Sequence, residues 1–404
     1  MMSLYDACLK CNLCELHCPV LRVNPAFPGP KNGGPGLERL RAAGRPVDES
    51  GLDLCLGCRT CEVVCPSGIK PATLIAAPKA EKVRRKGLPL RDWLLTRTDL
   101  LGAVGVRTAP LTNGAMRSRP VRYALEKGLR ISRHKPFPRY QQGSFRDWFA
   151  RRPDPWEGRT PPNGSVAYFH GCSANAMEQH IARQAVAILE HNGFRVILPE
   201  QRCCGLPLLA NGDREEAGRW ARYNLEHLLP HARSGVPVLF TSTSCSLTMK
   251  EDYPHLLGSE EARSLASGCW DIAEFLLALH QEGRLRLDFR EVRLDLPYHQ
   301  PCHQRAHGIG IPALTLLRLI PGVRTWNLNA GCCGASGTYG FKAEKYETAM
   351  AVGAPLKEAI LAVDAPRVLS DCETCRWQIE HLTAREAVHP ITVLYEAYGL
   401  DKVR

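Results

Sequence analysis

The sequence predicts an α+β protein, in which a small helical region rich in cysteine precedes two homologous α/β units with mostly parallel sheets. Three observations lead to this fold class. Two matching four-cysteine motifs lie near the amino terminus, and Cys-Cys-Gly occurs twice later, at residues 203–205 and 332–334. Around each Cys-Cys-Gly, short β-rich runs alternate with helical patterns, which is typical of α/β units.

The cysteines are expected to be reduced. The chain has 404 residues and 18 cysteines, a length that suits two or three domains. Its first residues, MMSLYDACLK, lack the basic and apolar regions of a secretory signal. Metal ligands or buried thiols are therefore favoured over a disulfide framework. No apolar run approaches the roughly 18 residues of a membrane-spanning helix, so any membrane attachment is expected to be peripheral.

The first element, residues 1–88, is predicted to be a helical domain with two 4Fe-4S clusters. Its motifs are CLKCNLCELHCP, starting at Cys8, and CLGCRTCEVVCP, starting at Cys55. Three cysteines at two-residue gaps can hold three corners of a cubane, and the fourth ligates the other cluster. The ligands of one cubane are thus predicted to be Cys8, Cys11, Cys14 and Cys65. Those of the other are predicted to be Cys55, Cys58, Cys61 and Cys18.

Structural zinc is the alternative for these eight cysteines. Zinc sites usually combine two isolated Cys-x2-Cys pairs or a mixture of Cys and His. Two matching four-cysteine runs that end in Cys-Pro favour iron–sulfur clusters instead, and two clusters in one small domain predict electron transfer. The stretch between the motifs, VLRVNPAFPGPKNGGPGLERLRAAG, is rich in Gly and Pro and predicts a loop before a short helix.

The second element, residues 89–164, is predicted to be a basic amphipathic helical segment followed by a linker in the Pro- and Gly-rich stretch 141–165. Residues 79–152 contain nineteen Lys and Arg against five Asp and Glu, in a chain of net charge +11. Apolar side chains fall at helical spacing on one face, away from Arg91, Arg97 and Thr98. These apolar residues are Leu90, Trp93, Leu94, Leu100, Leu101 and Val104.

Two interpretations of this apolar face remain open. It can lie in the headgroup region of an anionic membrane, with the flanking arginines near the lipid phosphates. Alternatively, it packs on the first domain while the arginines are solvated or contact a partner subunit. Nucleic acid binding is not favoured, because the segment contains no recognised nucleic-acid module.

The third and fourth elements, residues 165–290 and 291–404, are predicted to be two copies of one α/β domain. Cysteines follow the predicted strands in SVAYFHGC, GFRVILPEQRCCG and VPVLFTSTSC, and again in VRLDLPYHQPC, VRTWNLNAGCCG and PRVLSDCETC. Equivalent cysteines lie 127–130 residues apart, which indicates an internal duplication. Because sites in parallel sheets form beyond the carboxyl ends of the strands, we expect the cysteines of each copy to meet.

The second copy offers more candidate metal ligands than the first. Its five cysteines exceed what one tetrahedral zinc ion uses, so they favour a cluster. The first copy has four candidate ligands, because Thr248 stands where the second copy has its last cysteine. Three interpretations of these four cysteines remain open: a cluster, a zinc site or reduced buried thiols. Cys269, at a predicted helix start, fits a lone buried thiol better than a displaced ligand. The candidates are Cys302, Cys332, Cys333, Cys372 and Cys375, and in the first copy Cys172, Cys203, Cys204 and Cys245.

The adjacent cysteines are not expected to form a disulfide with each other. Such a bond would close a strained eight-membered ring, whereas a shared metal centre can use both thiols. The glycine after each pair, Gly205 and Gly334, would let the backbone turn sharply beside the ligand.

These features resemble the iron–sulfur subunits of respiratory dehydrogenases related to heterodisulfide reductase, which share the Cys-Cys-Gly (CCG) domain. The resemblance is strongest to the C subunits of anaerobic glycerol-3-phosphate dehydrogenases. It runs through nearly the whole chain and includes RVNPAFPGPK, LRDWLLTRTDLLGAV, CCGLPLLANG, GCCGASGTYGFK and DCETCRWQIE. The dehydrogenase family implies flavin-bearing subunits that oxidise glycerol 3-phosphate to dihydroxyacetone phosphate. This chain would then be a peripheral protein at the cytoplasmic face of the inner membrane, passing electrons to the quinone pool.

The resemblance also carries expectations for the CCG cysteines. In heterodisulfide reductases a complete set binds a non-cubane iron–sulfur cluster, and that set maps onto the five cysteines of the second copy. The substitution by Thr248 puts an equivalent first-copy cluster in doubt. No dinucleotide fingerprint occurs in the chain, so the flavin is expected on another subunit.

Three functional classes are weighed. The first is an electron-transfer and membrane-anchoring subunit without its own substrate chemistry. The second is a subunit of a related glycolate or lactate oxidase, or a heterodisulfide reductase-like enzyme with its own substrate site. There, His299, His303 and His307 would be candidate proton donors, although surface or core histidines are commoner. The third treats the α/β copies as zinc-stabilised docking platforms.

Overall fold

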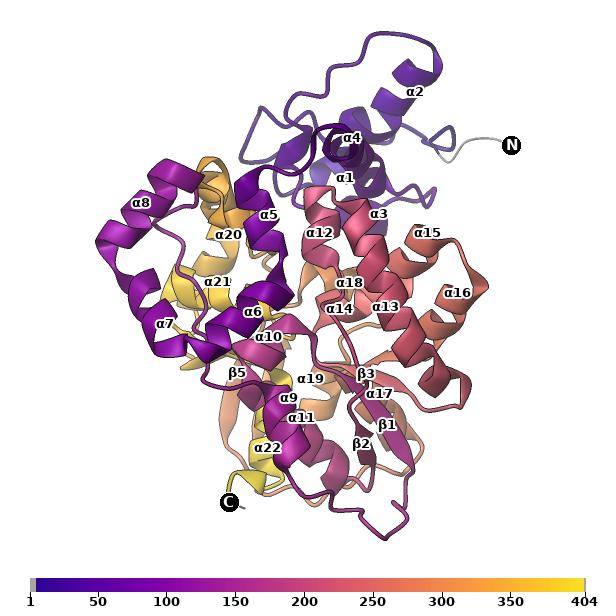
Figure 1. Cartoon of the computed structure of the whole chain (residues 1–404), viewed down its shortest axis with the longest axis vertical. Helices are drawn as coiled ribbons and strands as arrows, with labels where there is room; N and C mark the ends of the chain where they lie inside the picture. Colours follow the sequence, from indigo (N-terminus) through magenta and orange to yellow (C-terminus); the bar gives the residue numbers. More distant parts are fainter. Residues whose placement is uncertain (1–4, 403–404) are drawn as a thin grey trace.

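A computed structural model describes residues 5–402, with a helical domain above two α/β domains (Figure 1). The strand order is β2-β1-β3-β4 in the first α/β domain and β6-β5-β7-β8 in the second. Every pair of neighbouring strands in both sheets is parallel. The predicted fold class is therefore confirmed.

The helical domain is made of short turns around one long helix. Pro71 in the first turn and Gly87 just beyond the last residue mark the ends of that long helix, α4. The loop and short helix predicted between the two cysteine motifs are present as a series of turns that leads into η1 and α2. The elements are α1 (Leu13–Leu16), the π-helical turn η1 (Asn32–Gly36), α2 (Leu37–Ala42), η2 (Leu52–Leu54), α3 (Thr60–Val63) and α4 (Pro71–Lys86).

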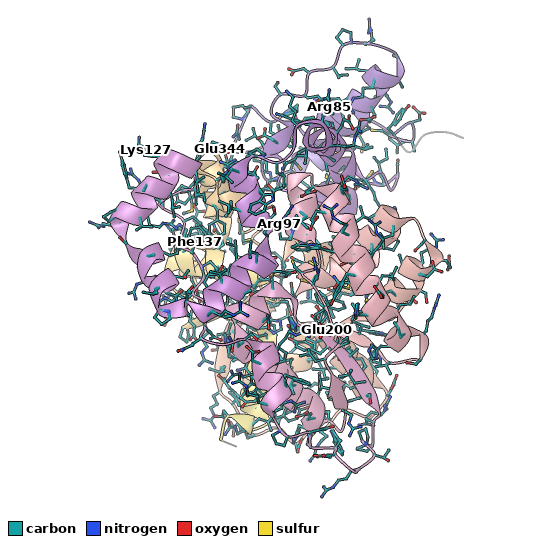
Figure 2. All side chains as sticks on the ribbon, viewed as in Figure 1. Arg85, Arg97, Lys127, Phe137, Glu200 and Glu344 are labelled. Atoms are coloured by element: carbon teal, nitrogen blue, oxygen red, sulfur yellow. The ribbon has the colours of Figure 1, made fainter. Side chains whose placement is uncertain are left out.

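The basic segment forms four helices, and the pattern over residues 90–104 is not one continuous helix. Arg97, with φ −83° and ψ 59°, separates α5 from α6, and its guanidinium bonds Asp213 at 3.1 Å. Figure 2 shows Arg97 facing the first α/β domain and Lys127 at the outer side of α8. The helices are α5 (Leu90–Thr96), α6 (Thr98–Arg107), α7 (Ala109–Arg117) and α8 (Arg119–Leu129).

The predicted linker contains a helix, α9 (Phe145–Arg151). Ser144 and Asp147 form a reciprocal capping box at its start, which satisfies backbone donors that the first turn leaves free. The Phe145 side chain is fully buried and meets the Tyr168 ring edge-on, with centroids 5.8 Å apart. The sequence predicted a linker here because Pro and Gly residues are frequent around this short helix, and this composition decided the prediction in spite of Phe145.

The first α/β domain alternates strands and helices. Cys269 lies in strand β4 and not at a helix start, since the following helix begins at Ile272, capped by Asp271. The strands are β1 (Ser165–Phe169), β2 (Arg195–Ile197), β3 (Val238–Phe240) and β4 (Cys269–Asp271). The helical elements are α10 (Gly171–Ala176), α11 (Gln179–His191), α12 (Leu206–Asn211), α13 (Arg214–Arg233), α14 (Thr243–Leu247), η3 (Thr248–Asp252), α15 (Tyr253–Leu257), α16 (Glu260–Ser267) and α17 (Ile272–Gln281).

The second α/β domain repeats this order with fewer helices. Its strands are β5 (Leu294–Tyr298), β6 (Val323–Asn327), β7 (Arg367–Leu369) and β8 (Glu386–Val388). Its helical elements are α18 (Cys302–His307), α19 (Pro312–Leu317), η4 (Tyr339–Phe341), η5 (Ala343–Lys345), α20 (Tyr346–Leu361), α21 (Glu373–Thr383), α22 (Pro390–Ala397) and η6 (Leu400–Lys402).

The two sheets share one hydrophobic core. Successive side chains of β1 point to opposite faces, so Val166 and Tyr168 join this core together with Leu296 and Tyr298 of β5. Phe169, on the opposite face, belongs to a separate core that contains Cys203 and Cys204. The cysteines of the second domain likewise lie outside the shared core. Each sheet thus contributes one face to the shared core, and the cysteines lie outside this core.

Ion pairs connect the helical parts to both α/β domains. In the basic segment, Asp92 pairs with buried Lys342 of the second domain at 3.0 Å. In the helical domain, Lys70 pairs with Glu251 of the first domain at 3.0 Å. Between residues 5 and 402, no helix is both long and apolar enough to cross a membrane.

Candidate metal centres

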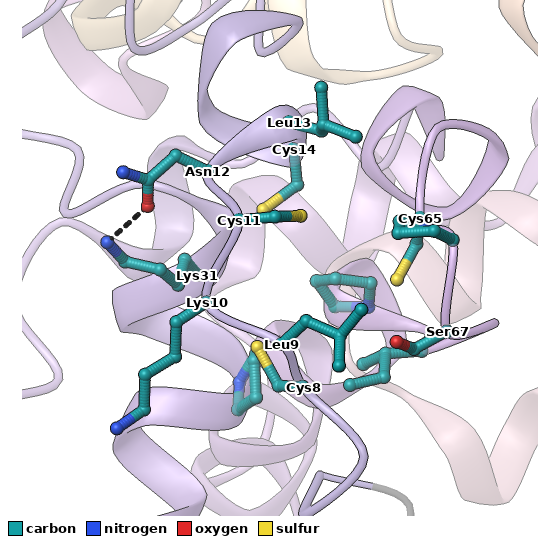
Figure 3. A pocket seen from close by; sticks show the side chains of 14 residues that line it. Cys8, Leu9, Lys10, Cys11, Asn12, Leu13, Cys14, Lys31, Cys65 and Ser67 are labelled. Carbon is teal, nitrogen blue, oxygen red and sulfur yellow. Dashed lines mark hydrogen bonds between the residues drawn. The ribbon is translucent and has the colours of Figure 1, made fainter.

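The four cysteines assigned to one cubane line a single pocket of the helical domain (Figure 3). They are Cys8, Cys11, Cys14 and Cys65. Lys10 and Asn12, between the first three cysteines, have positive φ values of 56° and 65°. Left-handed backbone costs a non-glycine residue about 1–2 kcal/mol and persists where a functional geometry demands it. The loop therefore curves around the sulfur atoms as a cluster cradle requires.

The other four cysteines line a second, neighbouring pocket, made of Cys18, Cys55, Cys58 and Cys61. The same left-handed turns recur there, at Gly57 and Arg59, with φ values of 66° and 57°. The backbone N–H of Gly57 points at the Cys55 sulfur, 3.4 Å away, and can donate to a bound thiolate. Burial raises the pKa of Cys55 to about 12, so metal binding there must displace a proton.

The five cysteines of the second α/β domain converge at the carboxyl edge of its sheet. The sulfurs of Cys333 and Cys375 lie 3.1 Å apart. Hydrogen bonds with Cys332 and Cys375 lower the pKa of Cys333 to about 5. Cys302 is hydrogen-bonded to Cys332, and Cys372 to Cys375, so all five thiols belong to one contact chain.

The four cysteines of the first α/β domain also meet. The sulfurs of Cys172 and Cys203 lie 3.9 Å apart, and further contacts run from Cys203 to Cys204 and from Cys204 to Cys245. The hydrogen bonds with Cys172 and Cys204 hold the pKa of Cys203 well below its usual value. The Thr248 hydroxyl donates to the Ser244 carbonyl at 2.8 Å and does not replace the missing thiol.

These sulfur sets fit metal binding better than disulfides. A disulfide needs about 2.05 Å between sulfurs, whereas bonds of about 2.3 Å to one tetrahedral ion put two sulfurs about 3.8 Å apart. The separation between Cys172 and Cys203 matches the second case, and the 3.1 Å between Cys333 and Cys375 lies between the two values. No two of the eighteen cysteines are joined by a disulfide. Metals bind thiolates, and each α/β set already holds thiols with a lowered pKa: Cys203 in the first set, and Cys333 and Cys372 in the second.

The glycine after each cysteine pair, where a sharp turn was predicted, has a left-handed backbone, with φ 86° at Gly205 and 83° at Gly334. The two positions differ in their surroundings. A Cβ on Gly334 would lie 2.1 Å from the Ala349 carbonyl oxygen, because the loop presses against α20. A Cβ on Gly205 would meet nothing closer than 3.7 Å.

The inner pocket of the helical domain adjoins the second α/β site. Cys18 and Cys332 are buried in one hydrophobic cluster, and Cys58 and Cys302 pack against it. Burial, followed by the negative charge of Cys302, raises the pKa of Cys58 to about 12. On the far side, the Ser244 hydroxyl lies 3.8 Å from the Cys372 sulfur and connects the two α/β sites. The inner pocket and the second α/β site therefore adjoin, and Ser244 brings α14, the helix that carries Cys245 of the first site, against the second site.

Two residues of the basic segment reach the cysteine sites, which the sequence patterns did not indicate. The Asp99 carboxylate accepts a hydrogen bond from the Cys203 backbone N–H at 3.1 Å, and burial raises its pKa to about 7. Lys135, only 3% exposed, bonds to Gln378, and its charge acts on Cys333 and Cys375. Both residues come from another element of the chain, so no local spacing could reveal them.

The three histidines near Cys302 are neutral at pH 7. Burial lowers the pKa of His299, His303 and His307 to about 4 in each case. His303 and His307 contact the hydroxyls of Ser244 and Ser246, both at 2.9 Å, across the boundary between the α/β domains. These contacts fix the two histidines at that boundary.

Comparisons with known protein families divide the chain in the same way, into one helical domain and two α/β domains. Residues 5–69 match the 4Fe-4S dicluster domain, and residues 166–250 and 296–380 each match the Cysteine-rich domain. The chain is 38% identical to the C subunit of the anaerobic glycerol-3-phosphate dehydrogenase of Escherichia coli K12, over 97% of this chain and 98% of the relative. It is 30% identical to the D subunit of a heterodisulfide reductase from Methanosarcina barkeri, over 52% of each chain. Lactate utilization protein A of Anoxybacillus flavithermus is 29% identical, over 44% of this chain and 75% of the relative.

Proposed function

Because the chain belongs to the family of the C subunits of anaerobic glycerol-3-phosphate dehydrogenases, we propose that it is the electron-transfer subunit of such a dehydrogenase. It would receive electrons from flavin-bearing subunits that oxidise glycerol 3-phosphate, and deliver them to the membrane quinone pool. No dinucleotide-binding fingerprint occurs in the sequence, which supports a flavin on other subunits.

One observation carries this proposal: the continuity between Cys58 of the inner pocket and Cys302 and Cys332 of the second α/β domain. When bound, iron–sulfur clusters supply one-electron carriers whose potential depends on burial and on hydrogen bonds to sulfur. The chain supplies both, through its apolar cluster and through backbone donors such as the N–H of Gly334, 3.4 Å from the Cys332 sulfur. Electron transfer from the inner pocket to the second α/β site requires the two sites to lie next to each other.

The exposed end of the proposed electron path lies in the outer pocket. Cys11 is solvent-exposed, and large apolar side chains are exposed on the same motif, with Leu9 at 69% and Leu16 at 63%. We assign the two cubane sites to the eight cysteines of the helical domain. A further non-cubane cluster is assigned to the five cysteines of the second α/β domain. The first α/β site offers four neighbouring thiols, the number that a zinc ion or a cubane uses.

Reconstitution of the complex from purified subunits tests the proposed electron path. The purified, iron-loaded protein should support reduction of a soluble quinone analogue by glycerol 3-phosphate only when the flavin-bearing subunits are present. Omission of this chain should leave flavin reduction intact but slow quinone reduction at least roughly tenfold, since the path to the acceptor is removed. Quinone reduction that is equally fast without this chain would contradict the proposal. Disulfide reduction by this chain alone would favour the heterodisulfide reductase-like alternative.

We also propose that the basic segment contacts the membrane surface. Leu90, Trp93, Leu100, Val104 and Leu111 on α5–α7 are all exposed, whereas Leu94 and Leu101 of the predicted face are half-buried. Exposed basic residues lie on the same run of helices: Arg107, Arg117, Arg119, Lys127 and Arg130. Exposed Trp and Leu with flanking Arg is a composition suited to the headgroup region of an anionic leaflet. This peripheral contact would put the chain at the cytoplasmic face of the inner membrane.

Liposome flotation checks this contact. The double substitution Trp93→Glu and Val104→Glu should lower binding to vesicles with anionic lipid by roughly tenfold, because two apolar side chains are replaced by charges that the lipid repels. Leu287→Glu is the matched control, since Leu287 is 54% exposed but lies outside the segment. Equal flotation of the double variant and the wild type would instead assign this surface to a partner subunit.

A further inference from the structure

His299 is held beside the second α/β site and has an unused ring nitrogen. It follows β5 directly, and its backbone N–H donates to the Leu369 carbonyl at 2.8 Å, which fixes it at the carboxyl edge of the sheet. The residue is 1% exposed, and its Nε2 has no hydrogen-bond partner among the described residues. A buried polar atom without a partner costs about 1–3 kcal/mol, so a purely structural role leaves this nitrogen unexplained.

The His299 ring lies among sulfur atoms. A ring nitrogen of His299 and the sulfurs of Cys333 and Cys375 all lie within 4.8 Å of one another. Ligands of one metal ion at about 2.1 Å for nitrogen and 2.3 Å for sulfur are separated by about 3.6 Å, which this arrangement reaches with small rotations of the side chains. Imidazole is a common iron ligand, and it takes the place of thiolate on one iron of Rieske centres.

The internal repeat supplies a comparison within the same chain. His170 stands 129 residues before His299, at the equivalent end of β1, and its Nε2 is likewise buried without a partner in the described part of the chain. However, the His170 ring meets the Phe145 ring edge-on, with centroids 5.8 Å apart. Among residues 5–402, the one potential three-ligand group contains His299 and excludes His170. The same repeated position thus faces an aromatic ring in one copy and thiols in the other.

We propose that His299 is a nitrogen ligand of the iron–sulfur centre in the second α/β domain, beside Cys333 and Cys375. This assignment rests on the proposed cluster at that site. It gives the second site six donor side chains, two more than the four clustered thiols of the first site. A neutral imidazole adds less negative charge than a thiolate, so it favours the reduced state and raises the reduction potential of the centre.

The direct test needs no substitution. In a crystal or cryo-electron microscopy structure of the iron-loaded full chain, the His299 nitrogen should lie about 2.1 Å from iron, the length of an imidazole–metal bond. A distance beyond about 3 Å from a fully loaded cluster overturns the ligand assignment and leaves the cluster proposal intact. A loaded protein without iron at this site overturns both. The structure therefore separates failure of the ligand from failure of the centre.

Spectroscopy of variants gives an independent measurement. Pulsed electron paramagnetic resonance of protein labelled with ¹⁵N-histidine should detect a nitrogen coupling of a directly bound imidazole. The coupling should disappear in His299→Gln and persist in His170→Gln, which alters the equivalent buried position. Iron content should stay constant in both variants, because five thiols remain at the second site. A strong coupling that persists in His299→Gln would contradict the assignment.

Discussion

Replacement of Cys61 by serine is expected to remove the inner cubane and interrupt the electron path. Cys61 is 8% exposed, so a serine there leaves a buried hydroxyl in place of a thiolate ligand, and iron content should fall by about four atoms per chain. Quinone reduction should drop at least roughly 100-fold, since even residues that only support metal ligands contribute about 10- to 100-fold. Iron and sulfide analysis, followed by the quinone assay in the reconstituted complex, measures both effects.

Cys269→Ser is the matched control for this substitution. Cys269 is also a buried thiol, at 1% exposure, and burial raises its pKa to about 12. It lies in β4, and the sequence pattern predicts it to be a lone thiol. Its replacement should therefore leave iron content and quinone reduction unchanged. Loss of iron in Cys269→Ser, or retention of all iron in Cys61→Ser, would show that the ligand assignment is wrong.

Gly334→Ala is expected to destabilise the second α/β domain by about 3 kcal/mol or more, through left-handed strain and overpacking together. The added Cβ would lie 2.1 Å from the Ala349 carbonyl oxygen, so either the Cys-Cys-Gly loop or α20 must move. Because Cys332 and Cys333 precede this residue, the displacement should also reduce metal retention at the second site. Urea unfolding measures the change in free energy, and iron analysis measures the loss of metal.

Alanine substitutions at two further glycines distinguish the effect of backbone strain from the effect of steric overlap. Gly331 and Gly205 have φ values of 84° and 86°, close to the 83° of Gly334, but an added Cβ would meet nothing within 4 Å at Gly331 and nothing closer than 3.7 Å at Gly205. Alanine at either position should cost about 1 kcal/mol from backbone strain alone. Equal destabilisation by all three substitutions would contradict the close contact between the Gly334 loop and α20.

Much of the architecture was predictable because local signals agreed with the fold. Cysteine spacing constrains a short loop, so the two N-terminal pockets contain the two groups that the spacing assigns. The duplication and the parallel sheets followed from the period of 127–130 residues and from strand-like runs before each cysteine. Convergence of the α/β cysteines then follows from topology, since the carboxyl ends of parallel strands share one edge.

The rest depends on contacts between distant parts of the chain. Apolar spacing over residues 90–104 predicted one face, but the ion pair between Arg97 and Asp213 helps to hold a break between two helices. Phe145 anchors a helix in the predicted linker because its ring packs against Tyr168 in the shared core. Asp99 contacts the backbone of Cys203, 104 residues away. None of these partners is visible in a local pattern, because tertiary packing overrides local composition.

The shared core between the two sheets bears on how the copies could diverge. Val166 and Tyr168 of the first copy are buried together with Leu296 and Tyr298 of the second, so neither half could be produced alone without exposing a broad apolar face. The same arrangement keeps the apolar contacts of β1 and β5 apart from the thiols. A substitution at a ligand position, such as the one occupied by Thr248, therefore leaves the shared hydrophobic core intact. An internal duplication of this kind permits one half to lose a ligand position while the other half keeps its full set.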